Sequence, residues 1–242
     1  MINHKLSVII PCYNEEKYIG RVVEKVLKAS LPDNMEKEII IIDDGSTDKS
    51  PVIIEAFSNA RSDGAIKVIL NVENKGKGAC VVMGLQQATG DLIVIQDADL
   101  EYDPAEYAKL LKPVLDGYAD VVYTSRLRGD APRRVMFFYY TLGVWFLTFL
   151  SNLFTQLNLT DIHSGYKLFK ADILKSMRLR EKRFGFDTEV TAKISRIKNI
   201  HIYEVGISYY GRSYSEGKKI KWTDGLKAIY WTFKYNLFLR KR

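Results

Sequence analysis

The sequence predicts an α/β fold with a mainly parallel sheet that helices cover on both faces. Short apolar runs of strand length alternate with segments in which apolar residues recur at helical spacing, and the loops between them are short. This alternation is typical of strand-helix-strand units, whose consecutive strands lie parallel. A length of 242 residues and a hydrophobic share of 47% suit one packed domain, so we expect a single domain over residues 1–242.

Five strands are expected, and each of the first four is followed by a helix. The predicted strands are residues 6–11, 38–42, 66–70, 92–96 and 121–125. The predicted helices cover about residues 19–27, begin near residue 49, run from residues 74–78 to about 89, and cover about residues 104–115.

The composition limits the kinds of partner. A net charge of +7 favours polyanions, which include nucleic acid, anionic lipid headgroups and phosphorylated substrates. Cys12 and Cys80 lack the spacing of a disulfide framework or a metal site, which fits a reducing cytoplasm. No secretory signal is visible at the start, because Lys5 precedes an apolar run that is only one strand long.

Polar residues follow every predicted strand, where an open parallel sheet binds its ligands. They are Tyr13, Asn14 and Glu15, then Asp43 and Asp44, Lys75 and Lys77, Asp97 and Asp99, and Arg126 and Arg128. The loop after the first strand has no glycine before Gly20, which excludes the usual dinucleotide fingerprint, and no Walker loop is present.

An acidic stretch follows the fourth strand and indicates a metal site. Asp97, Asp99 and Glu101 alternate directly after an apolar run, where charge is tolerated only at a strand end or beside a cation. Carboxylates so placed can hold a hard divalent ion that keeps open positions for phosphate oxygens. The alternative is an acidic turn that caps the strand, with Asp103 and Pro104 starting the next helix.

Four segments together carry a family resemblance. They are residues 7–16 (SVIIPCYNEE), 42–48 (IDDGSTD), 74–79 (NKGKGA) and 97–99 (DAD). In this order the chain resembles family 2 glycosyltransferases. Arg126, residues 161–169 and Arg212 extend the likeness to the branch of dolichyl-phosphate and polyprenyl-phosphate hexose synthases. The resemblance implies a single Rossmann-like nucleotide-sugar domain of the GT-A type, a divalent ion (Mg²⁺ or Mn²⁺) and inversion at the sugar carbon.

The resemblance also implies roles for individual residues. Asp97 and Asp99, with Glu101, would hold the metal on the donor diphosphate, and Asp99, Arg126 and Arg212 would be the catalytic residues. The residues expected at the nucleotide sugar are Pro11, Tyr13, Asn14, Glu15, Asp44, Lys77, Asp97 and Lys218. Arg212 and Lys218 would lie in a basic loop that closes over the leaving group. The alternatives are residues that merely end strands and a mobile, solvated loop.

The acceptor decides whether the enzyme needs a general base. A sugar hydroxyl must lose a proton as it attacks, and Asp187 or Glu189 lies where relatives with sugar acceptors keep their base. A lipid monophosphate has a second pKa of about 6 and needs no base, but it needs cations. The candidates are Arg126, Arg128 and Arg134. His163 is expected to be a polar lining residue.

Residues 133–160 are predicted to form one or two amphipathic helices at a membrane interface. Residues 135–160 carry no charge and would span about 39 Å as a helix, enough to cross a bilayer. A polar stripe at Thr141, Thr148, Asn152 and Thr155 argues against a lipid-facing span, so we expect interfacial helices with Tyr139, Tyr140 and Trp145 near the headgroups. The alternatives are a core helix hairpin and a true span.

Residues 224–242 are predicted to form a second amphipathic helix, which is basic, aromatic and capped by Asp224. A dimer interface or an ordinary packing helix would look similar. No nucleic-acid module accompanies the basic residues, so we expect no nucleic-acid partner.

The sequence thus predicts an inverting, metal-dependent transferase that makes a polyprenyl-phosphate hexose as a peripheral protein at the cytoplasmic membrane face. Residues 74–78 resemble glucosyl-type members of the family, which favours a UDP-sugar over GDP-mannose. A homo-oligomer or a membrane partner is compatible with the sequence. The alternatives are a transferase that extends a surface glycan on a sugar hydroxyl and a non-catalytic nucleotide-sugar or lipid-binding accessory protein.

Overall fold

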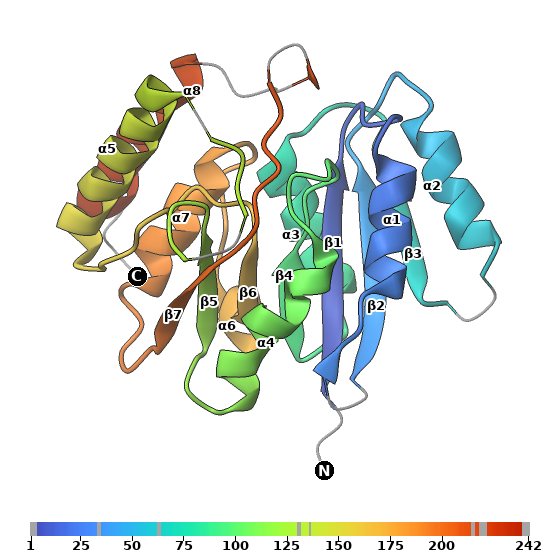
Figure 1. Cartoon of the computed structure of the whole chain (residues 1–242), viewed down its shortest axis with the longest axis horizontal. Coiled ribbons are helices and arrows are strands. Elements are labelled where there is room, and N and C mark those ends of the chain that lie inside the picture. The colour runs from blue at the N-terminus through green and yellow to red at the C-terminus, as the bar shows by residue number, and fades with distance from the viewer. Residues whose placement is uncertain are drawn as a thin grey trace.

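The computed structural model describes residues 4–32, 35–61, 64–129, 132–135, 137–213, 216–217 and 222–238. Its centre is a seven-stranded sheet in the order β3-β2-β1-β4-β6-β5-β7 (Figure 1). The strands are β1 (Lys5–Cys12), β2 (Glu36–Asp43), β3 (Ile66–Leu70), β4 (Leu92–Ile95), β5 (Val121–Ser125), β6 (Lys167–Lys170) and β7 (Ile202–Gly206). The α-helices in this part of the chain are α1 (Ile19–Lys28), α2 (Ser50–Asn59), α3 (Lys77–Gln87), α4 (Tyr107–Leu115), α5 (Phe138–Thr155), α6 (Ala171–Ser176), α7 (Gly185–Ile194) and α8 (Trp222–Phe233). The predicted α/β class is confirmed.

Helices cover both faces of the sheet, which explains why its central strands are continuously apolar. All four isoleucines of β2 are fully buried. Ile39 and Ile41 pack in a core with residues of α1, α2 and α4, whereas Ile40 and Ile42 pack in a second core with residues of α3, α6 and α7. Successive side chains of a strand point to opposite faces, so a run of isoleucines serves both cores.

Two strands were not predicted, β6 and β7. β6 pairs antiparallel with both β4 and β5, whereas the other ladders between the strands described are parallel. Its sequence, Lys167-Leu168-Phe169-Lys170, is only four residues long and has a lysine at each end, so it gives no apolar run. β7 lies at the edge of the sheet and is only partly buried, which removes the apolar signal of a core strand.

Helix α5 lies outside α7, and its polar stripe faces the protein. It is one helix of 18 residues that contacts α7 and α8 (Figure 1). Thr148 and Thr155 of the stripe are buried, and Asn152 bonds both backbone groups of Leu159. The exposed face is instead the apolar one, formed by Phe138, Tyr139, Leu142, Trp145, Phe146, Phe149 and Leu153. Among the residues described, no helix has both the length and the apolar character needed to cross a bilayer.

The predicted C-terminal helix begins earlier than expected. α8 starts at Trp222, so Asp224 lies in its first turn and is not the capping residue. A π-helical turn, Lys234–Phe238, continues it, and residues 239–242 lie outside the described part of the chain. Phe233 packs edge to face on Phe154 of α5, with ring centroids 5.3 Å apart, so the two helices form one layer.

Candidate active site

The loops that follow β1 and β4 bring three acidic side chains around one arginine. Arg212, which follows β7, donates from Nη1 to Glu15 Oε2 at 3.0 Å and from Nη2 to Asp99 Oδ2 at 2.6 Å. Its backbone N–H donates to Glu101 Oε1 at 2.7 Å. The guanidinium also lies 5.2 Å from the ring centroid of Tyr18. The predicted site residues Glu15, Asp99 and Arg212 are therefore in direct contact.

Asp97 forms an ion pair with Lys77, the first residue of α3. The turn before α3 is fixed by Asp44, which accepts the backbone N–H of Lys75 and that of Gly76 at 2.8 Å each. Asp44 thus places Lys77 at the site from a buried position, and its carboxylate is occupied by the backbone. Its contact with the nucleotide sugar stays a prediction.

Asn14 has a similar structural task. Its Oδ1 accepts the backbone N–H of Thr47 at 2.8 Å, and its own N–H donates to Ser46 Oγ at 2.9 Å. These bonds join the loop after β1 to the loop after β2. Pro11 is part of β1 and pairs with β2, whereas Tyr13 is exposed beside this loop. The predicted nucleotide residue Lys218 lies outside the described residues.

The donor set at Asp97 and Asp99 fits a divalent ion. Burial, with Asp97 and Glu101 nearby, raises the pKa of Asp99 to about 7, so a cation bound beside this carboxylate would favour its charged form. Two carboxylates leave open positions for diphosphate oxygens, as Mg²⁺ and Mn²⁺ sites on nucleotides require. Glu101 instead accepts the Tyr209 hydroxyl and the Arg212 N–H. Within the described residues no three acidic, cysteine or histidine side chains converge as a metal site, and the place of Glu101 among the metal ligands stays a prediction.

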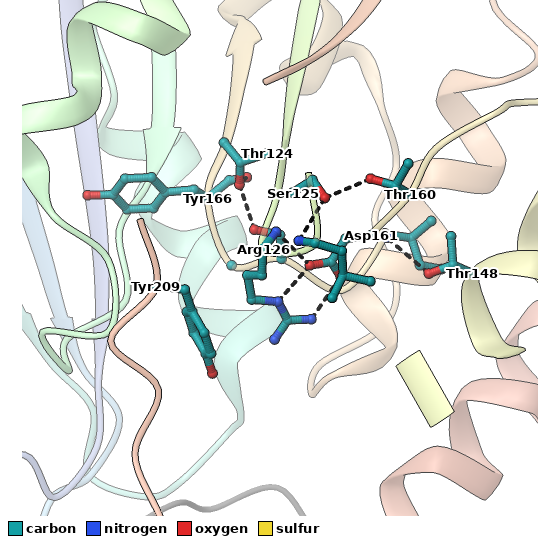
Figure 2. Close-up of polar contacts among 12 residues, drawn as sticks. Thr124, Ser125, Arg126, Thr148, Thr160, Asp161, Tyr166 and Tyr209 are labelled. Carbon is teal, nitrogen blue, oxygen red and sulfur yellow. Dashed lines mark hydrogen bonds and ion pairs between the residues drawn. The ribbon is translucent and has the colours of Figure 1, made fainter. Parts of the chain in front are cut away.

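Arg126, at the end of β5, is buried in an ion pair with Asp161 (Figure 2). Nε donates to Oδ2 at 2.6 Å and Nη2 to Oδ1 at 2.8 Å, and the side chains are only 4% and 0% exposed. Burial alone would raise the pKa of Asp161, but the Arg126 guanidinium holds this pKa below its usual value. Nη1 reaches the Tyr140 hydroxyl of α5 at 3.3 Å. In this structure Arg126 is therefore a buried and paired side chain that orders this region, and its contact with an acceptor stays a prediction.

The other predicted acceptor cations lie near the surface. Arg128 is exposed and 3.5 Å from Glu204 Oε2, and Arg134 pairs with Glu216 at 2.6 Å. Arg133, which the sequence analysis did not include among the acceptor cations, is exposed and donates to the backbone oxygen of Arg126 at 2.9 Å. The signal was present, since an arginine pair directly precedes the aromatic segment.

The two candidate bases are both held by other groups. Asp187 accepts from the fully buried Lys167 at 2.5 Å, and although burial opposes it, Lys167 and Lys77 lower the pKa of Asp187. Glu189 is fully buried, accepts the backbone N–H groups of Arg180 and Glu181, and pairs with Lys193. Glu189 therefore fixes the chain before α7 and has no contact with solvent. The buried partner Lys167 was not foreseen, because a lysine inside a strand gives no core signal.

Comparison with solved structures confirms the fold. Glucosyl-3-phosphoglycerate synthase from Mycobacterium tuberculosis, crystallised with Mn²⁺, UDP and glucosyl-3-phosphoglycerate, matches 96% of this chain and 80% of its own with a TM-score of 0.73 and 19% identity. A crystal of the same enzyme contains Mg²⁺ and UDP. The fold is thus that of GT-A glycosyltransferases.

The sequence comparisons give the family. Residues 7–178 match the model of glycosyl transferase family 2, and the chain belongs to this family. The undecaprenyl-phosphate 4-deoxy-4-formamido-L-arabinose transferase of Proteus mirabilis is 39% identical over 51% of this chain and 37% of its own length. The low-salt glycan biosynthesis hexosyltransferase Agl6 of Haloferax volcanii is 32% identical over 93% of this chain and 52% of its own. The chain therefore spans about half or less of the length of these relatives.

Proposed function

We propose that this protein transfers a hexose from a nucleoside diphosphate sugar to a polyprenyl phosphate, with inversion and with Mg²⁺ or Mn²⁺. The observation that supports a polyprenyl phosphate as the acceptor is a hollow of about 310 Å³ at the start of α5. Its lining is apolar apart from one threonine and one arginine: Leu127, Arg133, Phe138, Thr141, Leu142 and Trp145. An apolar hollow with a guanidinium at its wall suits an isoprenoid chain that ends in a phosphate.

The hollow adjoins the donor site through Arg126. Leu127 of the hollow is its neighbour in the chain, and the Arg126 guanidinium lies 5.3 Å from the ring centroid of Tyr209. The Tyr209 hydroxyl donates to Glu101 Oε2 at 3.0 Å, and Glu101 holds the Arg212 backbone. A phosphate held by Arg133 would therefore approach the donor from the β5 side.

Each residue then has a role in the transfer. Asp97 and Asp99 would hold the divalent ion, which supplies Lewis-acid stabilisation of the leaving diphosphate. Lys77 and Arg212, now paired with these carboxylates, are the cations that would donate to the diphosphate oxygens as the glycosidic bond breaks. Glu15 and Tyr18 hold the Arg212 guanidinium in place from its other sides.

The candidate bases also favour a phosphate acceptor. A general base works best with a pKa near the operating pH, whereas the pKa of Asp187 is lowered by Lys167 and Lys77. Glu189 is fully buried. A phosphate that is already ionised needs neither residue. The relatives named for undecaprenyl phosphate support the same acceptor, and the UDP bound in the structural neighbour supports a UDP-sugar donor.

An acceptor assay tests this function. Purified protein with Mn²⁺ and UDP-glucose, UDP-galactose or UDP-N-acetylglucosamine is expected to glycosylate undecaprenyl phosphate and to leave undecaprenol and alkyl glycosides unmodified. Arg133→Ala should raise the KM for undecaprenyl phosphate roughly ten- to a hundredfold, the value of a charge-assisted contact, without changing the donor KM. Lys112→Ala, which removes an exposed cation of α4, is the control. Transfer only to a glycoside hydroxyl would refute the assignment.

The exposed aromatic face of α5 also indicates where in the cell the protein lies. We propose that it lies in the headgroup region of a membrane, at the cytoplasmic face, so that the lipid acceptor enters the hollow directly. Trp145 and Phe149 stack with centroids 5.6 Å apart while remaining 57% and 51% exposed. Amphipathic aromatic helices with basic neighbours bind interfaces in this way.

Vesicle flotation tests the membrane contact. The double variant Trp145→Ser, Phe149→Ser is expected to bind vesicles containing anionic lipid on the order of tenfold more weakly, because less apolar surface is buried. Tyr118→Ser, which removes an aromatic side chain that is 61% exposed near the α4 end of the sheet, should bind like the wild type. High salt should release part of the protein. Equal binding of all three proteins would contradict the proposal that α5 contacts the membrane.

A further inference from the structure

The loop of residues 161–165 is fixed by its polar groups at several points. Asp161 is held by Arg126, and the Ser164 hydroxyl shares a hydrogen bond of 2.5 Å with the Thr124 hydroxyl. The Asp161 and Thr124 ends of these contacts are visible in Figure 2. A loop tied in this way has a defined shape before any ligand binds, so its remaining side chains are already positioned.

The same loop lies directly against the carboxylates of the donor site. The backbone N–H of Gly165 donates to the Tyr102 hydroxyl at 2.8 Å. A Cβ at Gly165 would collide with Asp97 Oδ2, so only glycine allows the loop to approach this carboxylate so closely. The loop therefore forms part of the wall beside the proposed site of the donor diphosphate.

His163 of this loop has a buried ring nitrogen that makes no hydrogen bond to the described residues. Its Nε2 is shielded from solvent and has no hydrogen-bond partner among the described residues. Such an atom costs about 1 to 3 kcal/mol when nothing bonds to it. Asp187, Lys167, Asp161 and Arg126 are the charged groups that act on the ring, and all four already have partners. A hydroxyl group that displaced the atoms covering Nε2 would satisfy it without breaking any of these pairs.

The charge state of His163 indicates the kind of group it would bind. Burial, the largest cause, lowers the pKa of His163 to about 4, so the imidazole is neutral at pH 7. A neutral imidazole has one donor and one acceptor nitrogen, which matches a sugar hydroxyl. The phosphates already have cations, Lys77 and Arg212, at the adjacent carboxylates.

We propose that His163 hydrogen-bonds a hydroxyl of the donor hexose and so contributes to the choice of sugar. The inference rests on the proposed function, since it requires a nucleotide sugar whose diphosphate lies at Asp97 and Asp99. It assigns His163 a contact with the sugar alone. Loss of the side chain should therefore weaken a UDP-hexose and leave UDP unaffected.

Calorimetric titration with Mn²⁺ and UDP, UDP-glucose or UDP-galactose tests this assignment. In His163→Ala the affinity for UDP should stay within about twofold of the wild type, while that for the better-bound of the two UDP-hexoses should fall about five- to tenfold. His163→Gln, which keeps a donor and an acceptor, should recover part of the loss and change the ratio between the two sugars. His201→Ala, at an exposed histidine paired with Asp120, is the control.

The outcomes separate the inference from the function it rests on. Unchanged UDP-hexose affinities in His163→Ala, or an equal loss for UDP and the UDP-hexoses, would overturn the sugar contact while leaving the transferase assignment intact. A wild type that binds neither UDP nor a UDP-hexose would overturn the proposed uridine donor and the inference with it. Thermal melting of each variant shows whether the fold is retained, and His163→Gln keeps the test valid if His163→Ala unfolds.

Discussion

Asp99→Asn is expected to lower turnover about a hundred- to a thousandfold while the protein remains folded. The substitution removes one negative charge from the carboxylate pair that would hold the metal, so the leaving diphosphate loses its main stabilisation. The side chain lies at a loop in contact with Arg212 and outside the two apolar cores, so the fold should persist. Steady-state kinetics with Mn²⁺ measure the effect, and EDTA should silence the wild type.

The matched control is Asp103→Asn in the same acidic stretch. Asp103 accepts the N–H of Ala105 at the start of the next helical turn and pairs with Lys25 at the surface, away from Arg212. Asparagine keeps the capping oxygen, so turnover should be near normal. Full activity of Asp99→Asn, or of the wild type in EDTA, would exclude the metal role of this carboxylate.

Arg126→Met is expected to lower the free energy of unfolding by roughly 3 to 5 kcal/mol, because it leaves Asp161 charged, fully buried and without its partner. Arg128→Met, at an exposed arginine, should cost less than about 1 kcal/mol. Adding Asp161→Asn to Arg126→Met should recover part of the loss, since the uncompensated charge is removed. Urea unfolding of the four proteins measures these differences.

The Arg126–Asp161 ion pair also predicts how the loss of unfolding free energy in Arg126→Met depends on pH. In the wild type the pKa of Asp161 is lowered, so its stabilisation is complete above the unfolded value of about 3.9 and is lost as the pH falls towards the folded value. In Arg126→Met burial, which raises the pKa of Asp161, is no longer offset by the guanidinium and is opposed mainly by the backbone N–H of residue 126, so folding is penalised as the pH rises. The difference between the two proteins should therefore be large at pH 7 and shrink below about pH 4. A difference that is independent of pH would show that the ion pair is not its source.

The sequence predicted the parts of the site that follow from strand ends. Asp97 and Asp99 lie after β4 and Glu15 after β1, and adjacent parallel strands bring such residues together. The sequence could not show which charges are occupied by distant partners. Arg126 depends on Asp161, and Glu189 on the backbone of residues 180 and 181, so each looks catalytic until its partner is known.

The two missed strands and the inward polar stripe of α5 have a common physical cause. Periodicity reports burial, and burial of Lys167 is possible only because Asp187 neutralises it from another element. In α5 the threonines bond within the protein, as Thr155 does to the Ser151 carbonyl, so a polar stripe can face inwards. The pattern identified the two faces of α5 correctly but could not tell which one the protein covers.

The position of β6 has a consequence for synthesis of the chain. β6 lies between β4 and β5, yet it follows both in the sequence. During translation β1 to β4 can pair as soon as they emerge, but the outer edge of β4 has no partner until residues 167–170 leave the ribosome. At usual elongation rates this takes on the order of ten seconds. For that time the nascent protein carries an open apolar strand edge, the kind of surface on which neighbouring chains pair and which chaperones cover.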